Sequence, residues 1–529
     1  MIVPGPAHVD SSLLQTTMPL FRGLLVLPPE LLLSIFQHID PPDLFSLGQT
    51  CGRIRSLASN RHLWESALKT TCRLNQLFEP SYHPIAALSL AEVQSVALGP
   101  WSSSDSFASL SSPYLGHGSS SPQVGHPPPR RQRIWNMILL CEWEDNTEMQ
   151  DICVVPGGRY VLGSTETLVC IWDLGQNTGS PLGASANKDG SMGRYDPVYS
   201  PVPAHLLHAP TGSMIWSMSE PTPVGSSSFR FVTGQNSSFC VYEVGPLPSD
   251  CYIRRIATLF LAPTLSLDDL WIQGDRLFIQ YREGLLVWDF ILSTYVAVPT
   301  RGDVSMITTR GDFFVAWEGL NTGVWSIPPL RPLPPDKDPM DLPELTSPVE
   351  FINGIDFNLI LNEGLDHRPA CRIRIPSPWY SFPSNAVEFI FLCEEDAEQR
   401  VSIERYIMNI TSGEGIGSPS TLISSSHPIP VLLAPEYEGY RTLCGSLAAT
   451  VTTGLPPHGE VRAIHSVGDG FRSRPKGAGI VDKVRYGSQG IGVVGAEIIS
   501  YCPGSGRVAC VPINADVAET QPRIICIGY

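Results

Sequence analysis

The stretch from Leu27 to Trp64 (LPPELLLSIFQHIDPPDLFSLGQTCGRIRSLASNRHLW) constrains the fold more than any other part of the chain, because it combines helix-start signals with helical apolar spacing. Pro28 and Pro29 suit the first turn of a helix, where a missing N–H leaves no hydrogen bond unmade. The apolar stripe that follows is made of Leu31, Leu32, Ile35, Phe36 and Ile39. These signals predict a first helix that begins at the prolines and buries one face.

Signals for three further short helices follow along the chain. Asp40 is placed as an N-cap with Pro41 at the first helical position, and Gly48 marks the end of this second helix. The apolar positions of the third and fourth helices are Cys51, Ile54, Leu57 and Ala58, then Leu63, Trp64 and Leu68. A bundle this small buries little core, so we expect it to depend on a partner.

The LPPELL opening, the DPPDL turn and the terminal Leu-Trp occur together at the spacing of a known module. The stretch resembles the F-box, by which substrate-receptor proteins dock onto the Skp adaptor of SCF ubiquitin ligases. The resemblance implies a protein that brings targets to a ubiquitin-transfer machine and is not itself an enzyme. The alternative is a small helical bundle without a docking role.

Position in the F-box motif selects seven residues as the adaptor-facing set: Leu27, Pro28, Glu30, Leu31, Ile35, Leu44 and Leu47. For each of them, the alternative role is packing inside the module. The chain departs from the family at one point, because F-boxes often carry a Trp in the third helix near Ile54 and this one does not. Ile54 is left to fill the core.

Composition excludes several classes of function. With 529 residues the chain needs more than one core. A net charge of −16 argues against nucleic acid as the main partner, since phosphate contacts need clustered Lys and Arg. The 13 cysteines form no C-x-x-C pair, and no phosphate-loop, nucleophile-elbow or zinc-protease motif is present. We therefore expect no cofactor, no metal and no catalytic residue.

The N-terminal residues give no targeting signal. Residues 1–23 lack the basic start and apolar run of a signal peptide. The apolar stretch 24–36 is interrupted by Pro28, Pro29 and Glu30 and is too short to span a bilayer. The sequence predicts a protein of the cytoplasm or nucleus, with reduced cysteines and no membrane partner.

Changes in composition divide the chain into four parts. We expect a disordered tail over 1–23, the F-box and its trailing helix over 24–78, a linker over 79–133, and a β-rich domain over 134–529. The apolar run 85–98 favours a linking helix, and most of the rest of the linker is Ser-, Gly- and Pro-rich. The chain is thus a multidomain protein, all-α and then all-β.

Four segments of the β-rich part share one form, namely short strands, a Gly-containing or polar turn, and a closing strand centred on an aromatic residue. The closing aromatics are Trp172, Tyr242, Trp288 and Trp325. The segments resemble blades of a WD-repeat β-propeller, although the usual Gly-His pair is missing. We assign the tryptophans to blade packing. Two packed sandwiches are the alternative architecture.

Blade length and further strand-like runs set the size of the predicted propeller. Blades of about 40 to 45 residues allow six to eight of them, with loop insertions near 175–213 and 328–350. Further strands are predicted at 386–393, 401–410, 441–452, 461–467, 491–500 and 507–513. Residues 134–143 are expected to supply a strand to the last blade and close the ring.

The two resemblances together imply the substrate-recognition subunit of an SCF-type ubiquitin ligase. The F-box would dock the Skp adaptor and, through it, cullin and RING subunits, while the propeller would bind a target protein. Arginines in predicted loops, such as Arg230, Arg276, Arg282 and Arg310, either pair with phosphates on a target or are solvated surface charges. The alternatives are a scaffold that uses the F-box without a cullin and an enzyme in the β-rich part.

Overall fold

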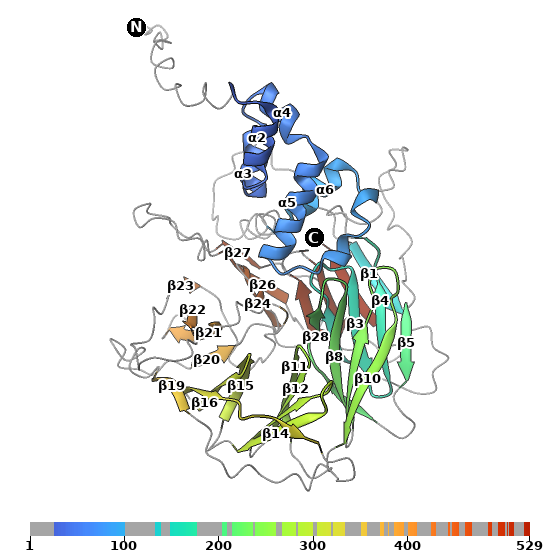
Figure 1. The fold of residues 1–529 in the computed structure, drawn as a ribbon, viewed down its shortest axis with the longest axis vertical. Coiled ribbons are helices and arrows are strands. Elements are labelled where there is room, and N and C mark those ends of the chain that lie inside the picture. Colours follow the sequence, from blue (N-terminus) through green and yellow to red (C-terminus); the bar gives the residue numbers. More distant parts are fainter. Residues whose placement is uncertain are drawn as a thin grey trace, which may run out of the picture.

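The structure is a computed structural model of the chain, and Figure 1 shows helices at one end and strands over the remainder. It describes residues 26–100, 133–138, 149–176, 204–208, 214–235, 238–260, 267–281, 284–299, 304–318, 321–333, 351–356, 371–374, 379, 386–395, 400–409, 425–429, 443–444, 447–453, 461–467, 485–488, 496–502, 505, 507–512 and 523–528. The predicted tail and the Ser/Gly/Pro-rich segment lie outside these residues.

Residues 26–100 form a helical module, as the sequence predicts. Its elements are α2 (Pro29–Phe36), α3 (Pro41–Gly48), α4 (Gly52–Ala58), α5 (Arg61–Leu74), the 3₁₀ turns η2 (Glu79–Tyr82) and η3 (Ile85–Ala87), and α6 (Leu90–Ala97). Helix α6 lies in the segment predicted as a linker, where the apolar run favoured a helix. Ser89 and Glu92 start it with a reciprocal capping box.

The core of the helical module is built from the predicted apolar stripes. Leu32 and Phe36 of α2 and Trp64 of α5 are buried there, and Ile54 fills the place where the F-box family often has a Trp. Gly48 closes α3 where α4 packs against it, because a Cβ at this position would lie 3.3 Å from the Cβ of Ala58. The module is therefore packed by local helical contacts.

The strands form seven antiparallel sheets within the described residues, which we number as blades 1 to 7 along the chain. Blade 1 consists of β2 (Met149–Val154), β3 (Tyr160–Thr165), β4 (Leu168–Asp173) and β5 (His205–His208). Blade 2 consists of β6 (Ile215–Met218), β7 (Thr222–Val224), β8 (Ser228–Gln235), β9 (Ser238–Val244) and β10 (Ile253–Phe260). Blade 3 consists of β11 (Leu267–Gln273), β12 (Arg276–Tyr281), β13 (Gly284–Asp289), β14 (Thr294–Pro299) and β18 (Arg331–Pro332).

The remaining four blades follow the same plan. Blade 4 consists of β15 (Val304–Arg310), β16 (Phe313–Glu318), β17 (Asn321–Ser326) and β19 (Phe351–Asp356). Blade 5 consists of β20 (Cys371–Arg374), β21 (Ala386–Glu395), β22 (Arg400–Asn409) and β23 (Ser425–Ile429). Blade 6 consists of β24 (Leu443–Cys444), β25 (Leu447–Thr453), β26 (Val461–Val467) and β27 (Arg485–Ser488). Blade 7 consists of β28 (Ala496–Cys502), β29 (Arg507–Pro512), β30 (Arg523–Gly528) and β1 (Arg133–Ile138).

The sheets close into a ring, which makes the β domain a seven-bladed β-propeller (Figure 1). Strand β2 of blade 1 lies against β28 of blade 7, and the N–H of Val154 donates to Ser500 Oγ across this junction. Strand β1 pairs along its whole length with β30, so a strand that precedes blade 1 completes the last blade. The predicted closing strand is confirmed, and two packed sandwiches are excluded.

Two short strands lie inside the stretches predicted as insertions. Strand β5 forms the outer edge of blade 1, and β18 pairs with β14 at the edge of blade 3. Both strands are too short to carry a periodic pattern, which is why the sequence did not reveal them. The remaining parts of these insertions, 177–203, 209–213 and 334–350, lie outside the described residues.

Aromatic residues of the third strands pack the blades, as expected. Trp172 and Trp288 are buried, and Trp325 is half-buried against the neighbouring cluster of blade 3 and blade 4 residues. Among the residues that the structure describes, the indole Nε1 atoms of Trp172 and Trp288 have no hydrogen-bond partner. These tryptophans are thus packing elements within the β domain.

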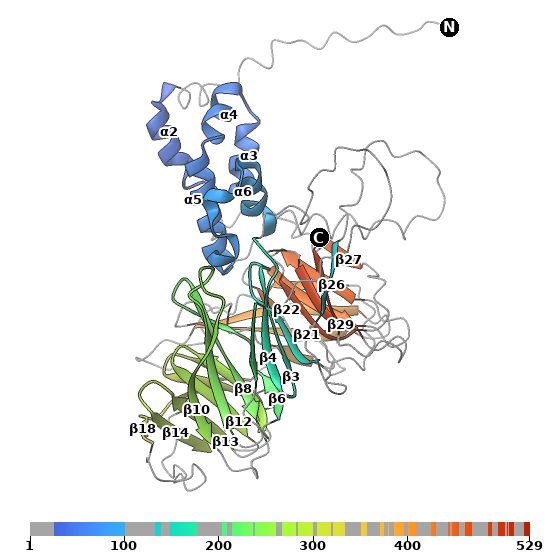
Figure 2. The same ribbon diagram turned by 90° about the vertical axis from the view of Figure 1, so that its right-hand side faces the viewer.

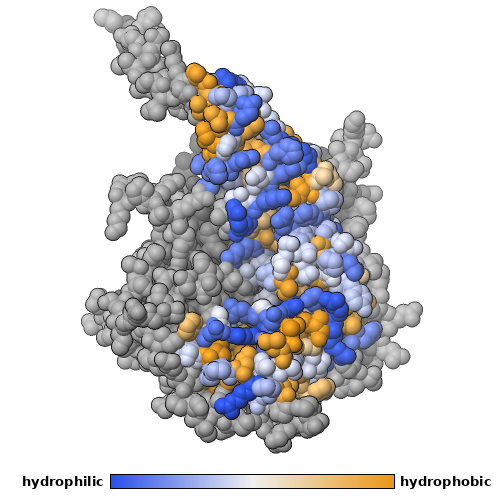
Figure 3. All heavy atoms as spheres, viewed as in Figure 1, coloured by the Kyte–Doolittle hydropathy of each residue, from blue (hydrophilic) through white to orange (hydrophobic). Residues whose placement is uncertain are grey.

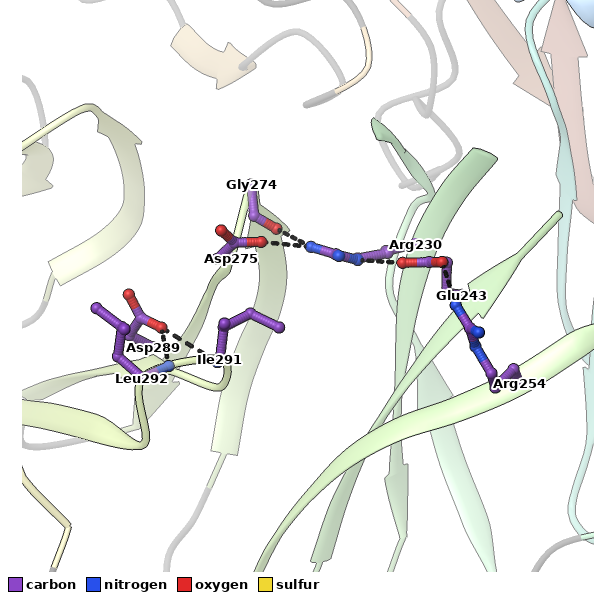
Figure 4. Close-up of polar contacts among 8 residues, drawn as sticks. All are labelled: Arg230, Glu243, Arg254, Gly274, Asp275, Asp289, Ile291 and Leu292. Carbon is purple, nitrogen blue, oxygen red and sulfur yellow. Dashed lines mark hydrogen bonds and ion pairs between the residues drawn. The ribbon is translucent and has the colours of Figure 1, made fainter. Parts of the chain in front are cut away.

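Arginines join neighbouring blades at the end where the first and second strands of each blade meet. Arg230 of blade 2 pairs with Glu243 of its own blade at 2.9 Å and with Asp275 of blade 3 at 2.6 Å, and its Nη1 also donates to the carbonyl of Gly274 (Figure 4). Beside this contact, Asp289 accepts the N–H groups of Ile291 and Leu292. Arg230 therefore connects two blades instead of facing solvent.

The adjacent blade repeats this contact in a more exposed form. Arg276 of blade 3 pairs with Asp312 of blade 4 at 2.9 Å and donates to the carbonyl of Gly311. The side chains of Arg276 and Asp312 are 30% and 77% exposed, whereas that of Arg230 is only 11% exposed. Both arginines, considered above for phosphate pairing, form ion pairs within the propeller. Arg282 lies outside the described residues, and Arg310 ends strand β15.

We predict that Arg230→Ala destabilises the propeller by about 2–3 kcal/mol, because it removes hydrogen bonds between charged groups within blade 2 and between blades 2 and 3, while Glu243 keeps its ion pair with Arg254. Arg276→Ala should cost less than about 1 kcal/mol, since its ion pair is largely exposed. Amide exchange in peptides covering β8 and β12 measures both effects. Equal losses in the two variants would contradict the dependence on burial.

Candidate functional site

The helical module carries exposed apolar side chains next to its core. Leu32 and Phe36 face inward, while Leu31 and Ile35, one position earlier on the same helix, are 52% and 42% exposed. In α3, Leu44 is buried and Phe45 is 46% exposed. A step of one residue turns a helix by 100°, so each helix presents one apolar stripe to the core and a second to solvent. We call Leu31, Ile35 and Phe45 the apolar face.

The structure separates the seven residues chosen from the F-box motif. Pro28, Glu30, Leu31 and Ile35 are exposed, whereas Leu27 and Leu47 are half-buried against the helical core. Leu44 is 1% exposed and belongs to the core cluster, so in this structure it packs within the module instead of facing a partner. Motif position alone cannot decide whether Leu44 or Phe45 faces the core, because both are large apolar residues on one short helix.

Two exposed apolar residues were not in the motif-based set. Phe45 follows Leu44 on α3, and Val26 precedes the first helix. Helical spacing was the available signal for Phe45, since one of two adjacent apolar residues must point away from the core. Figure 3 shows hydrophobic side chains gathered toward the outer end of the helical module. Contiguous exposed apolar surface of this kind marks interaction sites in soluble proteins.

The helical module stands on blades 1 and 2 of the propeller (Figure 2). The N–H of Phe78 donates to the carbonyl of Pro156 at 3.1 Å, in the turn between β2 and β3. Gln176 Nε2 donates to the carbonyls of Tyr82 and Pro84 at 2.7 and 2.9 Å. These bonds contact one end of blade 1. This end carries the turn between β2 and β3 and the C-terminal end of β4.

A salt bridge of blade 1 strengthens this junction. Arg159 pairs through two nitrogens with both carboxylate oxygens of Asp173, each at 2.7 Å, and its remaining Nη1 donates to the carbonyl of His83 at 2.7 Å. Bidentate pairing fixes the plane of the guanidinium group. The helical module and the propeller are thus joined by directed hydrogen bonds as well as by shared apolar packing.

The thiols near this junction are not activated. Burial, followed by Glu79, raises the pKa of Cys72, and burial together with Asp173 raises the pKa of Cys251 to about 12. Both remain protonated at neutral pH. Within the part of the chain that the structure describes, no group of three His, Cys, Asp or Glu side chains could hold a metal ion. None of the described helices is long and apolar enough to cross a membrane.

Comparison with known families identifies the helical module. Residues 24–69 match the family model described as F-box-like, which spans the helices from α2 through most of α5. This match includes every residue of the apolar face. The chain therefore contains an F-box-like domain, a class of module that mediates protein–protein interaction. A search of the curated proteins found no significant match.

Solved structures similar to the chain are propellers. The WD40 domain of SCAP from fission yeast has a TM-score of 0.34 at 10% identity, covering 72% of this chain and 84% of that one. Hsv2 from Kluyveromyces lactis has a TM-score of 0.34 at 8% identity, covering 71% of this chain and 97% of that one. With scores this low, they add nothing to the assignment, which rests on the seven sheets and their closing strand.

The different burial of neighbouring residues predicts different costs of truncation. Leu44→Ala should destabilise the helical module by about 2–5 kcal/mol, because it leaves a cavity in the core. Leu31→Ala and Ile35→Ala should each change stability by less than about 1 kcal/mol. Amide exchange of peptides from α5 reports the stability of the module. An unchanged exchange rate in Leu44→Ala would contradict its place in the core.

The helical module approaches blade 1 so closely that we expect position 157 to require glycine. Gly157 has φ +98°, and a Cβ there would lie 2.6 Å from the Cβ of Ser81 in the helical module. Gly274, in the corresponding turn of blade 3, has φ +60° with open space around it. We expect Gly274→Ala to cost about 1–2 kcal/mol from backbone strain alone. Gly157→Ala should lower the stability clearly more than Gly274→Ala does, and amide exchange in β3 measures this loss. Equal losses in the two variants would contradict the close contact with Ser81.

Proposed function

We propose that the chain is the substrate-recognition subunit of an SCF-type ubiquitin ligase, whose F-box-like module docks a Skp-family adaptor. The observation that carries the proposal is the apolar face of α2 and α3. Leu31, Ile35 and Phe45 stay exposed within the F-box-like match while the adjacent Leu32, Phe36 and Leu44 fill the core. An adaptor that covered this face would remove three large apolar side chains from water.

Apolar burial would supply part of the free energy of such docking. Full burial of a Leu, Ile or Phe side chain stabilises by about 1.5–3 kcal/mol, and these three begin about half exposed. Covering them would therefore contribute about 2–5 kcal/mol before the surrounding contacts are counted. Leu27, Pro28, Glu30 and Leu47, which line the same helices, would complete the contact, with Glu30 as a charged group at its rim.

The topology of the propeller favours one end of the ring as the surface that binds the target. In each meander of four antiparallel strands, the first and third connections share one end of the blade and the second connection lies at the other end. The helical module contacts blade 1 at the first of these ends, through Pro156 and Gln176. The opposite end of the ring, which includes the turn at Glu166 and Thr167, is free of these contacts and is the proposed target surface.

In this proposal the chain catalyses no reaction itself. The adaptor would connect it to a cullin and a RING subunit, and a ubiquitin-conjugating enzyme held there would supply the reactive thioester. Binding of the target to the same assembly raises the effective concentration of its lysines near that thioester. The protein would act in the cytoplasm or the nucleus.

The test is co-purification of the full chain with adaptor and cullin, compared with a Leu31→Asp, Ile35→Asp double variant. Two buried carboxylates on the apolar face should reduce adaptor binding at least a hundredfold, which corresponds to about 2.8 kcal/mol. Leu292→Asp is the control, because Leu292 is an apolar residue on the propeller that is even more exposed than Leu31 and Ile35. It should bind the adaptor as the unmodified chain does.

The outcomes separate the proposal from its alternatives. Adaptor and cullin that appear with the unmodified chain and with Leu292→Asp, but not with the double variant, support the ligase role. Adaptor without cullin would favour a scaffold that uses the F-box alone. Binding that survives in the double variant, or is absent from the unmodified chain, would contradict docking through the apolar face.

A further inference from the structure

Within the described residues, three blades hold their next neighbour by the same contact. In each, an arginine at the start of the second strand donates to the carbonyl oxygen of a glycine in the first turn of the following blade. The pairs run from blade 7 to 1, from 2 to 3 and from 3 to 4, and they are Arg507 with Gly158, Arg230 with Gly274, and Arg276 with Gly311. We call this contact the arginine latch; Figure 4 shows the one made by Arg230.

Blade 1 has a tyrosine where the latch arginine would stand. In the strand register, Tyr160 lies opposite Asp173. The latch residues hold the same position, because Arg230 lies opposite Glu243 and Arg276 opposite Asp289. The ring of Tyr160 is fully buried, and its hydroxyl has no hydrogen-bond partner within the described residues. Its place in the blade is therefore that of a latch residue, but its ring packs against Phe78 on the apolar side and lies 5.1 Å from the guanidinium carbon of Arg159.

The helical module occupies the space beside Tyr160. The ring of Phe78 lies edge-on to Tyr160 of blade 1 at 6.3 Å, to Phe229 of blade 2 at 5.9 Å, and to Trp379 at 5.4 Å. Trp379 belongs to the connection between β20 and β21 of blade 5, and its Nε1 donates to the carbonyl of Gln76 at 2.8 Å. Phe78 thus fills the junction between blades 1 and 2 and is buried by residues from three blades.

We infer that the segment 76–84, with Phe78 at its centre, replaces the arginine latch between blades 1 and 2 and so fixes the orientation of the helical module on the propeller. Phe78 is in this sense a positioning residue: it contacts neither the adaptor face nor the proposed target surface. The inference adds to the proposed function, because a fixed orientation holds a bound target at one distance from the ligase.

Hydrogen bonds around Phe78 resist rotation of the module. Backbone carbonyls of the segment accept from side chains of the propeller at Gln76, Tyr82, His83 and Pro84. The donors are Trp379, Gln176 and Arg159, which come from two different blades. Hydrogen bonds from two blades restrict the tilt of the helical module and also its distance from the propeller. A single flexible linker would restrict neither.

The test measures orientation directly in the full chain. Spin labels are attached through genetically encoded ketone residues at Ser34 of α2 and Leu292 of blade 3, both exposed, and the distance distribution between them is recorded by double electron–electron resonance. The unmodified chain should give one narrow distribution. Phe78→Ala should broaden it at least twofold, and Phe78→Leu, which keeps apolar volume without the ring contacts, should give an intermediate width.

Arg276→Ala is the matched control, because it breaks an arginine latch between blades 3 and 4 instead of the junction between blades 1 and 2. Its distribution should stay as narrow as that of the unmodified chain. A narrow distribution in Phe78→Ala would overturn the inference, and equal broadening in Arg276→Ala would do the same. Should Phe78→Ala fail to fold, the comparison of Phe78→Leu with Arg276→Ala decides in the same way.

Adaptor affinity distinguishes this inference from the proposed function. Purified Skp-family adaptor should bind Phe78→Ala within twofold of its affinity for the unmodified chain, because the apolar face is untouched. A large loss would mean that Phe78 maintains the fold of the module, which would overturn a role in orientation. If the adaptor binds neither chain, the proposed function fails, and the inference is decided by the distance distributions alone.

Discussion

The packing of Phe78 among Tyr160, Phe229 and Trp379 determines how the two parts of this chain are joined. One apolar cluster includes residues of the module, of blades 1 and 2, and of the connection within blade 5. The helical module also packs on blades 1 and 7 through a second apolar cluster that includes Trp172 and Cys502. The F-box-like region and the propeller therefore share a core, although composition and secondary structure divide them clearly.

The blades are connected by two kinds of contact with different physical properties. Arginine latches combine charge with a directed hydrogen bond to a glycine carbonyl, and the more exposed of them are open to screening by salt. The junction that carries the helical module is apolar, apart from the bonds that surround it. Ionic strength should therefore affect the seams between blades 3 and 4 more than the attachment of the module.

Local signals in the sequence were enough to predict the helices and most strands. Proline starts and apolar spacing located α2 to α5, and aromatic third strands located blades 1 to 4 even without the usual repeat signature. Leu44 shows the limit, because a motif assigns it to a partner while packing against α4 buries it. The role of Phe78 could not be predicted, since its contacts at 160, 229 and 379 come together only in the folded ring.

Ring closure by β1 and β30 has a consequence for the order of folding during synthesis. Strand β1 leaves the ribosome just after the helical module, but its partner β30 is among the last strands to be made. Domains usually fold as the N-terminal part emerges. This propeller cannot do so fully: the first six blades can form pairwise, while β1 waits as an unpaired edge until β30 has been made. During that time its N–H and C=O groups are open to pairing with another chain.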